Sequence, residues 1–264
     1  MASALIGGMC ERGFEAADIT VIDLDASTRE RLHADYGVAV LPAPDDNVFA
    51  SDVLVLAVKP QQMKSALAPF VGALRGTLVI SIAAGLRLVD IGRWLGDADA
   101  PYSRLVRCMP NTPALIGAGV TGMYAAPEVD VVARVLAGRI LSAVGNIVWV
   151  NDETQLNAVT GISGSGPAYV FHFIEALESA GLAQGFDAAG ARRLAIDTVL
   201  GAARLAEVSP DSPATLREKV TSKGGTTAAA LEHLAATGWH DALVGAVEAG
   251  SARSRELGEQ LGQD

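Results

Sequence analysis

Hydrophobic and polar positions follow two different patterns along the chain, and the change comes near residue 150. Before it, short β-branched and aliphatic runs alternate with stretches of helical spacing, which is the pattern of a parallel sheet with crossover helices. After it, the β-branched runs stop, and Ala-, Leu-, Glu- and Arg-rich stretches with helical spacing continue to the C-terminus. We therefore predict a doubly wound α/β domain over residues 1–150 and an all-α domain over residues 151–264.

The individual elements follow from the same patterns. In the first domain, strands are expected at residues 19–22, 53–58, 77–81, 105–108, 120–124 and 146–150, and helices at 28–36, 61–74 and 129–144. In the second domain, helices are expected at 153–180, with an interruption at 164–167, and at 187–208, 213–219, 226–236 and 239–261. The Glu- and Arg-rich tail from Arg253 is most simply a solvated helix face.

The beginning of the chain departs from the pattern of a Rossmann-like domain. Such a domain opens with a strand and a glycine-rich turn. Residues 1–9 instead have the composition of a helix, with no strand or glycine-rich turn before it in the sequence. Asp23 and Asp25 end the next strand, where the ribose-binding carboxylate belongs. The first strand and its turn are therefore apparently missing. Because losing a central strand leaves both neighbouring edges unpaired, we expect the natural protein to start upstream of Met1.

Charge and composition narrow the classes of function. The net charge of −10 disfavours nucleic acid and anionic membranes as partners, so an anionic ligand must be held by local geometry. Cys10 and Cys108 are too few for a disulfide framework or a metal cluster. The longest apolar runs are far shorter than the roughly 18 residues of a membrane span. We expect a cytoplasmic protein with no metal site and no membrane segment.

Residues 220–231 carry the clearest signal of a binding site. Gly224 and Gly225 allow backbone amides to approach a ligand, and Thr226 and Thr227 are expected to cap a helix. The free N–H groups and positive dipole end of that helix favour an anion, and without a lysine clamp the arrangement suits a carboxylate. On pattern alone, an ordinary capped helix after a glycine turn remains an alternative.

Three successive strands of the first domain end in small, proline or polar residues, at 57–60, 81–85 and 107–114. The carboxyl ends of parallel strands face the ligand crevice, and small side chains there let a flat ring or a pyrophosphate lie close. Each segment alone is equally well a strand followed by a turn. The four histidines lack metal-ligand spacing, and no hydrolase or phosphoryl-transfer motif is present.

Five motifs in order, at residues 57–60, 81–85, 107–114, 161–169 and 220–231, make the chain closely resemble pyrroline-5-carboxylate reductase over essentially its whole length. The resemblance implies an NAD(P)H-binding domain followed by a helical dimerisation domain that interlocks with a second subunit. It implies a homodimer that assembles into a larger ring of dimers. The implied reaction is the reduction of 1-pyrroline-5-carboxylate to L-proline with NADPH or NADH, the last step of proline biosynthesis.

The resemblance also assigns roles to single residues. It makes Thr227 the catalytic residue, because its hydroxyl faces the ring nitrogen. The implied substrate-binding residues are Ser222, Gly225, Thr226, Thr227, Glu153 and Lys219. The implied cofactor-binding residues are Met1, which matches an internal methionine of the family, and Asp25, Asn47, Ala57, Val58, Lys59, Pro60, Ala83 and Ala84. Reducing such an imine needs mainly positioning, with protonation from solvent, which agrees with the lack of an evident acid–base pair.

Two positions depart from the family's pattern. Asp25 stands where many members place a serine or arginine for the 2′-phosphate of NADPH, so we expect NADH to be used at least as well as NADPH. Lys223 replaces the usual proline before the glycines, which loosens that loop. Two other functions stay open: reduction of a related cyclic imine carboxylate, such as the six-membered homologue, and nucleotide binding with impaired catalysis.

Overall fold

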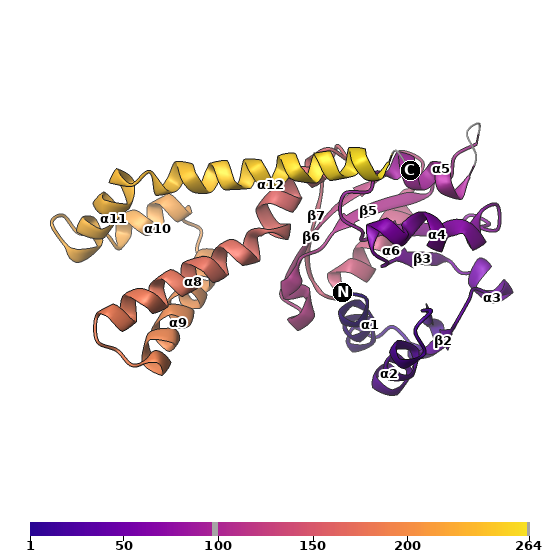
Figure 1. Ribbon diagram of the computed structural model, residues 1–264, viewed down its shortest axis with the longest axis horizontal. Helices are drawn as coiled ribbons and strands as arrows, with labels where there is room; N and C mark the ends of the chain where they lie inside the picture. The colour runs from indigo at the N-terminus through magenta and orange to yellow at the C-terminus, as the bar shows by residue number, and fades with distance from the viewer. Residues whose placement is uncertain (97–99, 263–264) are drawn as a thin grey trace. The chain divides into compact units, whose positions relative to one another are not determined.

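The computed structural model describes residues 1–96 and 100–262, and Figure 1 labels its helices and strands. The chain divides into two compact units, one formed by Met1–Ser165 with Glu248–Asp264 and the other by Gly166–Val247. The first boundary differs from the predicted one at residue 150, because residues after it pack within the α/β unit. Leu156 is fully buried there, and the Ser254 hydroxyl donates to Oδ1 of Asn157 at 2.9 Å.

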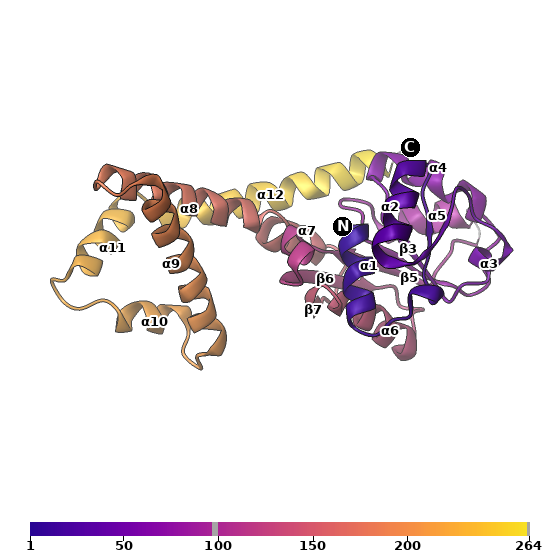
Figure 2. The same cartoon turned by 90° about the horizontal axis from the view of Figure 1, so that it is seen from below.

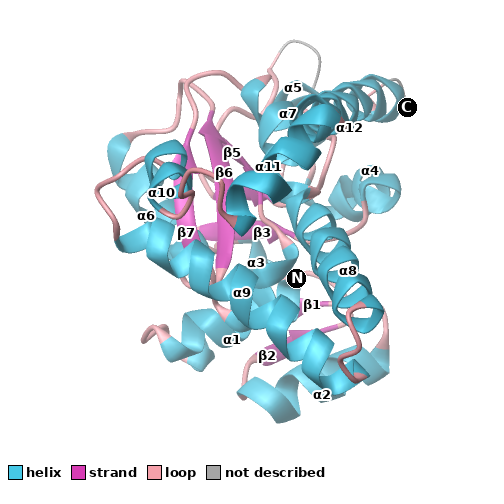
Figure 3. Ribbon diagram, turned by 90° about the vertical axis from the view of Figure 1, so that its left-hand side faces the viewer, coloured by secondary structure: helices cyan, strands magenta, loops and turns pink. Residues whose placement is uncertain are grey.

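The first unit contains two sheets, drawn in magenta in Figure 3. Strands β1 (Thr20–Ile22) and β2 (Ala39–Leu41) form a parallel pair. The second sheet has five strands in chain order: β3 (Val53–Leu56), β4 (Leu78–Ser81), β5 (Leu105–Met109), β6 (Gly119–Ala125) and β7 (Gly145–Trp149). Within residues 1–96 and 100–262, β1 and β3 do not pair with each other.

One strand pair corrects the expectation of a wholly parallel sheet. Strand β6 runs antiparallel to β5, with Arg107 opposite Tyr124, whereas the other neighbours in the five-stranded sheet are parallel. The connection between β5 and β6 holds only a short 3-10 helix, η4 (Thr112–Ile116). A parallel pair needs a crossover of about a dozen residues or more, so this short connection permits only the antiparallel arrangement.

Seven α-helices accompany these strands in the described part of the first unit, besides the end of the C-terminal helix. They are α1 (Ala2–Glu11), α2 (Ala26–Tyr36), α3 (Asp46–Phe49), α4 (Met63–Leu67), α5 (Leu88–Leu95), α6 (Val131–Ser142) and α7 (Gln155–Val159). Helix α1 agrees with the helical character expected for the start of the chain. The helix predicted over 61–74 is wrong in its length: 3-10 turns flank the short α4, and Pro69 prevents its continuation because proline lacks the backbone donor.

The core of the first unit covers both faces of the five-stranded sheet. Leu78 and Ile80 of β4 pack in one cluster with residues of α1 and α6, including Leu141. Val79, between them, packs in a second cluster with residues of α4 and α5, including Met63. Successive strand side chains point to opposite faces, so all of β4 is buried, as in a doubly wound sheet covered by helices on both sides.

The second unit is helical throughout. It contains α8 (Gly166–Ala183), α9 (Ala188–Val208), α10 (Pro213–Lys219), α11 (Thr226–Ala236) and the first part of α12 (Trp239–Leu261). The predicted bounds of α10, α11 and α12 are confirmed. The predicted interruption near 164–167 corresponds to one π-helical turn, Thr160–Gly164, and a bend at Ser165 before α8.

The helices of the second unit bury few side chains by themselves. Within Gly166–Val247, which the structure describes completely, α8, α10 and α11 have no buried residue, and α9 has only Ala191 and Ala195. Large apolar side chains are open to solvent instead, among them Phe171 at 61% and Val220 at 63% exposure. An apolar surface of this kind in a helical unit marks a face that another protein surface covers.

The C-terminal tail corrects one expectation. Ser254, Gly258 and Gly262 of the last turns are buried against the first unit, rather than forming a uniformly solvated face. No helix within residues 1–96 and 100–262 is long and apolar enough to cross a bilayer.

Candidate active site

A tight turn leads into α11 at the segment singled out by its sequence. Gly224 has φ of +71°, in the left-handed region that favours glycine. The amide of Gly225 donates to the carbonyl of Ser222 at 3.0 Å. A Cβ on Gly225 would lie 2.5 Å from the Ser222 hydroxyl oxygen and 3.2 Å from its carbonyl oxygen, so a larger residue here would make the Ser222 side chain turn away. Gly224 therefore allows the backbone turn, and Gly225 leaves room for the Ser222 hydroxyl.

The N-terminus of α11 is open. Its N-cap is Gly225, which has no side chain to accept a hydrogen bond, so the expectation that Thr226 and Thr227 cap the helix is wrong. The two threonines are instead its first two residues, with Thr226 exposed and Thr227 half-buried. The first turn of a helix carries backbone N–H groups without intrahelical partners and a positive dipole end. Together with the two hydroxyls, these groups suit a carboxylate.

Two other predicted substrate residues lie nearby along the chain. Ser222 is exposed and begins the turn. Lys219, the last residue of α10, forms an ion pair with Asp211 through its Nζ. That pairing neutralises much of the charge of Lys219. The exposed Lys223 lies within the segment itself, so residues 222–227 offer an anion one lysine besides their backbone amides.

In the first unit, two of the predicted cofactor segments leave the sheet side by side. Strands β3 and β4 are parallel, with Leu56 opposite Ser81, and the amide of Ile82 donates to the carbonyl of Leu56 at 3.1 Å. After them come Ala57, Val58 and Lys59, which are exposed, the partly buried Pro60, and then the buried Ala83 and the exposed Ala84. Ala57, Ala83 and Ala84 have small side chains, and at neighbouring carboxyl ends they leave room for a flat cofactor.

Asp25 has a defined local role. It is the N-cap of α2, and its carboxylate accepts hydrogen bonds from the hydroxyls of Ser27 and Thr28, both at 2.7 Å, and from the Thr28 amide at 2.9 Å. These bonds, led by the Ser27 hydroxyl, lower the pKa of Asp25 to about 2. A full negative charge therefore stands at the end of β1 at neutral pH. The remaining predicted cofactor residues, Met1 before α1 and Asn47 on α3, are exposed.

Glu153 belongs to the first unit, whereas residues 222–227 belong to the second. Its Oε1 accepts hydrogen bonds from the backbone amide of Leu88 at 2.8 Å and from Nη1 of Arg107 at 2.9 Å. The Arg107 side chain is only 5% exposed. Glu153 thus supports the start of α5, and its predicted contact with substrate remains a prediction. Sequence reasoning missed the role of Arg107, although a charge inside the apolar strand Leu105–Met109 was a signal.

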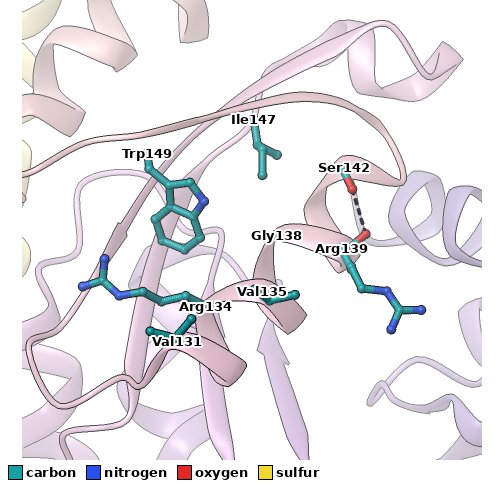
Figure 4. Close-up of a pocket in the computed structure, with 8 residues that line it drawn as sticks. All are labelled: Val131, Arg134, Val135, Gly138, Arg139, Ser142, Ile147 and Trp149. Atoms are coloured by element: carbon teal, nitrogen blue, oxygen red, sulfur yellow. Dashed lines mark hydrogen bonds between the residues drawn. The ribbon is translucent and has the colours of Figure 1, made fainter.

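A separate cavity of about 440 Å³ lies on α6 and β7, shown in Figure 4. Val131, Val135, Ile147 and Trp149 give it an apolar lining, and the Arg134 guanidinium lies 5.8 Å from the centroid of the Trp149 ring. No predicted site residue lines it. Within the described residues, no group of His, Cys, Asp and Glu side chains could hold a metal ion.

Comparison with protein families gives two matches. Residues 153–257 match the model described as pyrroline-5-carboxylate reductase dimerisation, and residues 1–85 match NADP oxidoreductase, coenzyme F420-dependent. The helical match begins close to the predicted domain boundary at residue 150, which itself stays a prediction.

Known proteins resemble the chain over nearly its whole length. A pyrroline-5-carboxylate reductase from Pseudomonas aeruginosa is 43% identical over 264 residues, covering 100% of this chain and 95% of the relative. A solved pyrroline-5-carboxylate reductase from Coxiella burnetii is 37% identical with a TM-score of 0.90, covering 97% and 94% of the two chains. The Plasmodium falciparum enzyme, solved with NADP bound, is 26% identical with a TM-score of 0.82, at the same coverage of 97% and 94%.

Proposed function

The chain belongs to the pyrroline-5-carboxylate reductase family, and we propose that its residues 222–227 hold the carboxylate of 1-pyrroline-5-carboxylate during reduction to proline. The chain is an oxidoreductase that uses NAD(P)H. The observation that carries the proposal is the open N-terminus of α11, which begins with Thr226 and Thr227 and has no side-chain cap. In a chain of net charge −10, an anionic substrate needs such a local site.

Each residue of this segment contributes in a different way. Gly224 and Gly225 shape the turn so that backbone amides can reach the carboxylate, and Ser222 and Thr226 add hydroxyl donors. The hydroxyl of Thr227 faces the ring nitrogen and orients the imine. Protonation of the nitrogen comes from solvent, so these residues act by binding and orientation rather than as strong acids.

The carboxyl ends of β3 and β4 would hold the cofactor, through residues 57–60 and through Ala83 and Ala84. Their fit rests on the small side chains of two parallel strands that end side by side. When bound, NAD(P)H supplies the hydride. The ionised carboxylate of Asp25 would repel a 2′-phosphate and accept ribose hydroxyls, so NADH serves at least as well as NADPH.

The helical domain is a dimerisation domain, and the chain therefore acts as an oligomer. We infer a homodimer that assembles into a larger ring of dimers. Support comes from the exposed apolar side chains of the second unit, such as Phe171 and Val220. We also infer a cytosolic location, which the two free cysteines favour. Sedimentation velocity tests the assembly: a species no larger than a dimer would exclude the ring.

The test of function is the oxidation of NADH and NADPH in the presence of 1-pyrroline-5-carboxylate, followed by cofactor absorbance and by chromatographic detection of proline. The six-membered homologue serves as the competing substrate. Faster turnover of the five-membered imine is expected. Equal or faster turnover of the six-membered imine would favour the alternative substrate, and cofactor binding without turnover of either would indicate impaired catalysis.

A further inference from the structure

The last turns of α12 pack directly on the turn that follows β4, which we call the 83–87 turn. In Figure 1 the yellow end of α12 lies beside α5, the helix that follows this turn, and Figure 2 shows the same region from below. A Cβ on Gly258 would lie 2.5 Å from the carbonyl oxygen of Gly85, closer than Cβ atoms approach a backbone oxygen. A Cβ on Gly85 would meet Leu257 at 3.6 Å and Leu261 at 3.7 Å. Gly258 therefore permits a backbone contact that any other residue would push apart.

Charged side chains fix the same end of α12. The carbonyl of Gly262 accepts a hydrogen bond from Nη2 of Arg93 at 2.7 Å. Arg93 and Arg87 flank the buried carboxylate of Asp90, at 3.6 Å and 2.8 Å respectively. Two arginines at the C-terminus of a helix also complement its negative dipole end. The contact is therefore held by directed bonds as well as by close packing.

The far end of the 83–87 turn is held independently. The amide of Leu88, the first residue of α5, donates to Glu153, which is itself paired with Arg107. The near end begins at Ile82, whose amide is bound to the carbonyl of Leu56. Between these two fixed ends, the carbonyl of Gly85 lies against α12, and only Ala83 and Ala84 lie between Gly85 and the fixed Ile82.

We propose that the end of α12 positions the cofactor, with Gly258 as a positioning residue that sets the 83–87 turn against which NAD(P)H binds. The inference rests on the proposed role of Ala83 and Ala84 in cofactor binding. It assigns to the C-terminal residues a part in the reaction although they touch neither substrate nor cofactor. Displacing a binding segment by about 1 Å is enough to change rates by up to two orders of magnitude, so a small shift here has a measurable effect.

The test compares Gly258→Ala with Gly245→Ala in the full-length protein. Both residues lie on α12, but a Cβ on Gly245 would meet nothing within 4 Å in the chain. NADH binding is titrated by fluorescence without substrate, and KM and kcat are then measured with 1-pyrroline-5-carboxylate. For Gly258→Ala we expect the dissociation constant and KM of NADH to rise on the order of tenfold, with KM of the imine and kcat at saturating NADH nearly unchanged. Gly245→Ala should match the wild type.

A second variant covers the case in which Gly258→Ala does not fold. Leu261→Ala removes a side chain that packs against the cluster of buried residues containing Ala83 and Leu86, without introducing a clash. Gln260→Ala changes an exposed side chain in the same helical turn. Leu261→Ala should weaken NADH binding in the same direction, whereas Gln260→Ala should not. Unchanged NADH binding in folded Gly258→Ala, or in Leu261→Ala if the first variant is unfolded, would overturn the inference. NADH binding is measured without the imine, so it tests this inference alone. If the proposed reaction is wrong, the wild-type protein will show no turnover in the kinetic assay, which is a separate result.

Discussion

Glu153 and Arg107 form an ion pair across 46 residues of sequence, with Oε1 of Glu153 2.9 Å from Nη1 of Arg107. The pair joins the middle of β5 to the segment just before α7, and the same carboxylate oxygen holds the amide of Leu88 at the start of α5. One side chain thus links three elements of the first unit. The turn between β4 and α5 depends on it.

Removing one partner of this pair should destabilise the first unit. Arg107→Met leaves Glu153 without its counter-ion in a largely buried site, which costs about 3–5 kcal/mol in known buried pairs. Arg31→Met is the matched control, because Arg31 pairs with Asp35 at 3.7 Å on an exposed helix face, where such a pair contributes about 0.5 kcal/mol or less. Urea unfolding at a fixed protein concentration measures the free energy of unfolding of both variants. Similar midpoints for Arg107→Met and Arg31→Met would contradict the prediction.

Thr227 should be the residue of the 222–227 segment whose hydroxyl matters most for turnover. Thr227→Ala removes a hydrogen bond to the reacting ring and should lower kcat/KM by about 100-fold, the order found for single positioned donors. Thr227→Ser keeps the hydroxyl and should recover most of the activity. Steady-state kinetics with saturating NADH checks this, and a Thr227→Ser variant as impaired as Thr227→Ala would show that the methyl group, not the hydroxyl, is needed.

Asp25 should set the choice between the two nicotinamide cofactors. Asp25→Ser removes the charge that repels a 2′-phosphate while keeping an oxygen that can cap α2. The ratio of kcat/KM for NADPH over NADH should rise by about tenfold or more, since a carboxylate facing a phosphate disfavours binding of the phosphate. A wild-type protein that already prefers NADPH clearly would count against this role for Asp25.

The protein should lose stability in acid partly through its helix-capping carboxylates. Hydrogen bonds from Ser27 and Thr28 lower the pKa of Asp25 from its usual value to about 2, and a hydrogen bond from the Ala133 amide lowers the pKa of Asp130. A folded-state pKa below the unfolded value means that the stabilisation is present above about pH 4 and is lost as the pH falls toward 2. Melting temperatures measured across that interval should fall less steeply for Asp25→Asn than for the wild type. If melting temperature falls equally steeply with pH in the variant and in the wild type, Asp25 does not contribute to the loss of stability in acid.

Local signals made the helical domain predictable from sequence. The helices were predicted from the helical spacing of their apolar residues. In the structure Ser212 and Asp187 cap α10 and α9, with Ser212 accepting from the Thr215 amide at 3.2 Å and Asp187 from the Gly190 amide at 2.7 Å. Each predicted strand of the first domain also coincides within two residues with an observed one. Such signals depend only on neighbouring residues, so they can be read from the chain directly.

Contacts between distant residues were not predictable in the same way. The antiparallel direction of β6 depends on the length of the loop before it, and the short β2, α3 and α5 have too few residues for a clear period. The burial of Gly258 depends on Gly85, which lies far away in sequence. Within the candidate site, the glycine turn was visible in the sequence, but the partners of Glu153 and Lys219 appeared only in the fold.

The exposed apolar helices of the second unit make the stability of the folded chain depend on protein concentration. In the homodimer proposed above, a second copy covers Phe171 and Val220, and the folded chain then gains stability as the concentration of that copy increases. The thermal midpoint of unfolding is then not fixed by the sequence alone. It shifts upward with concentration, and dilution alone promotes unfolding.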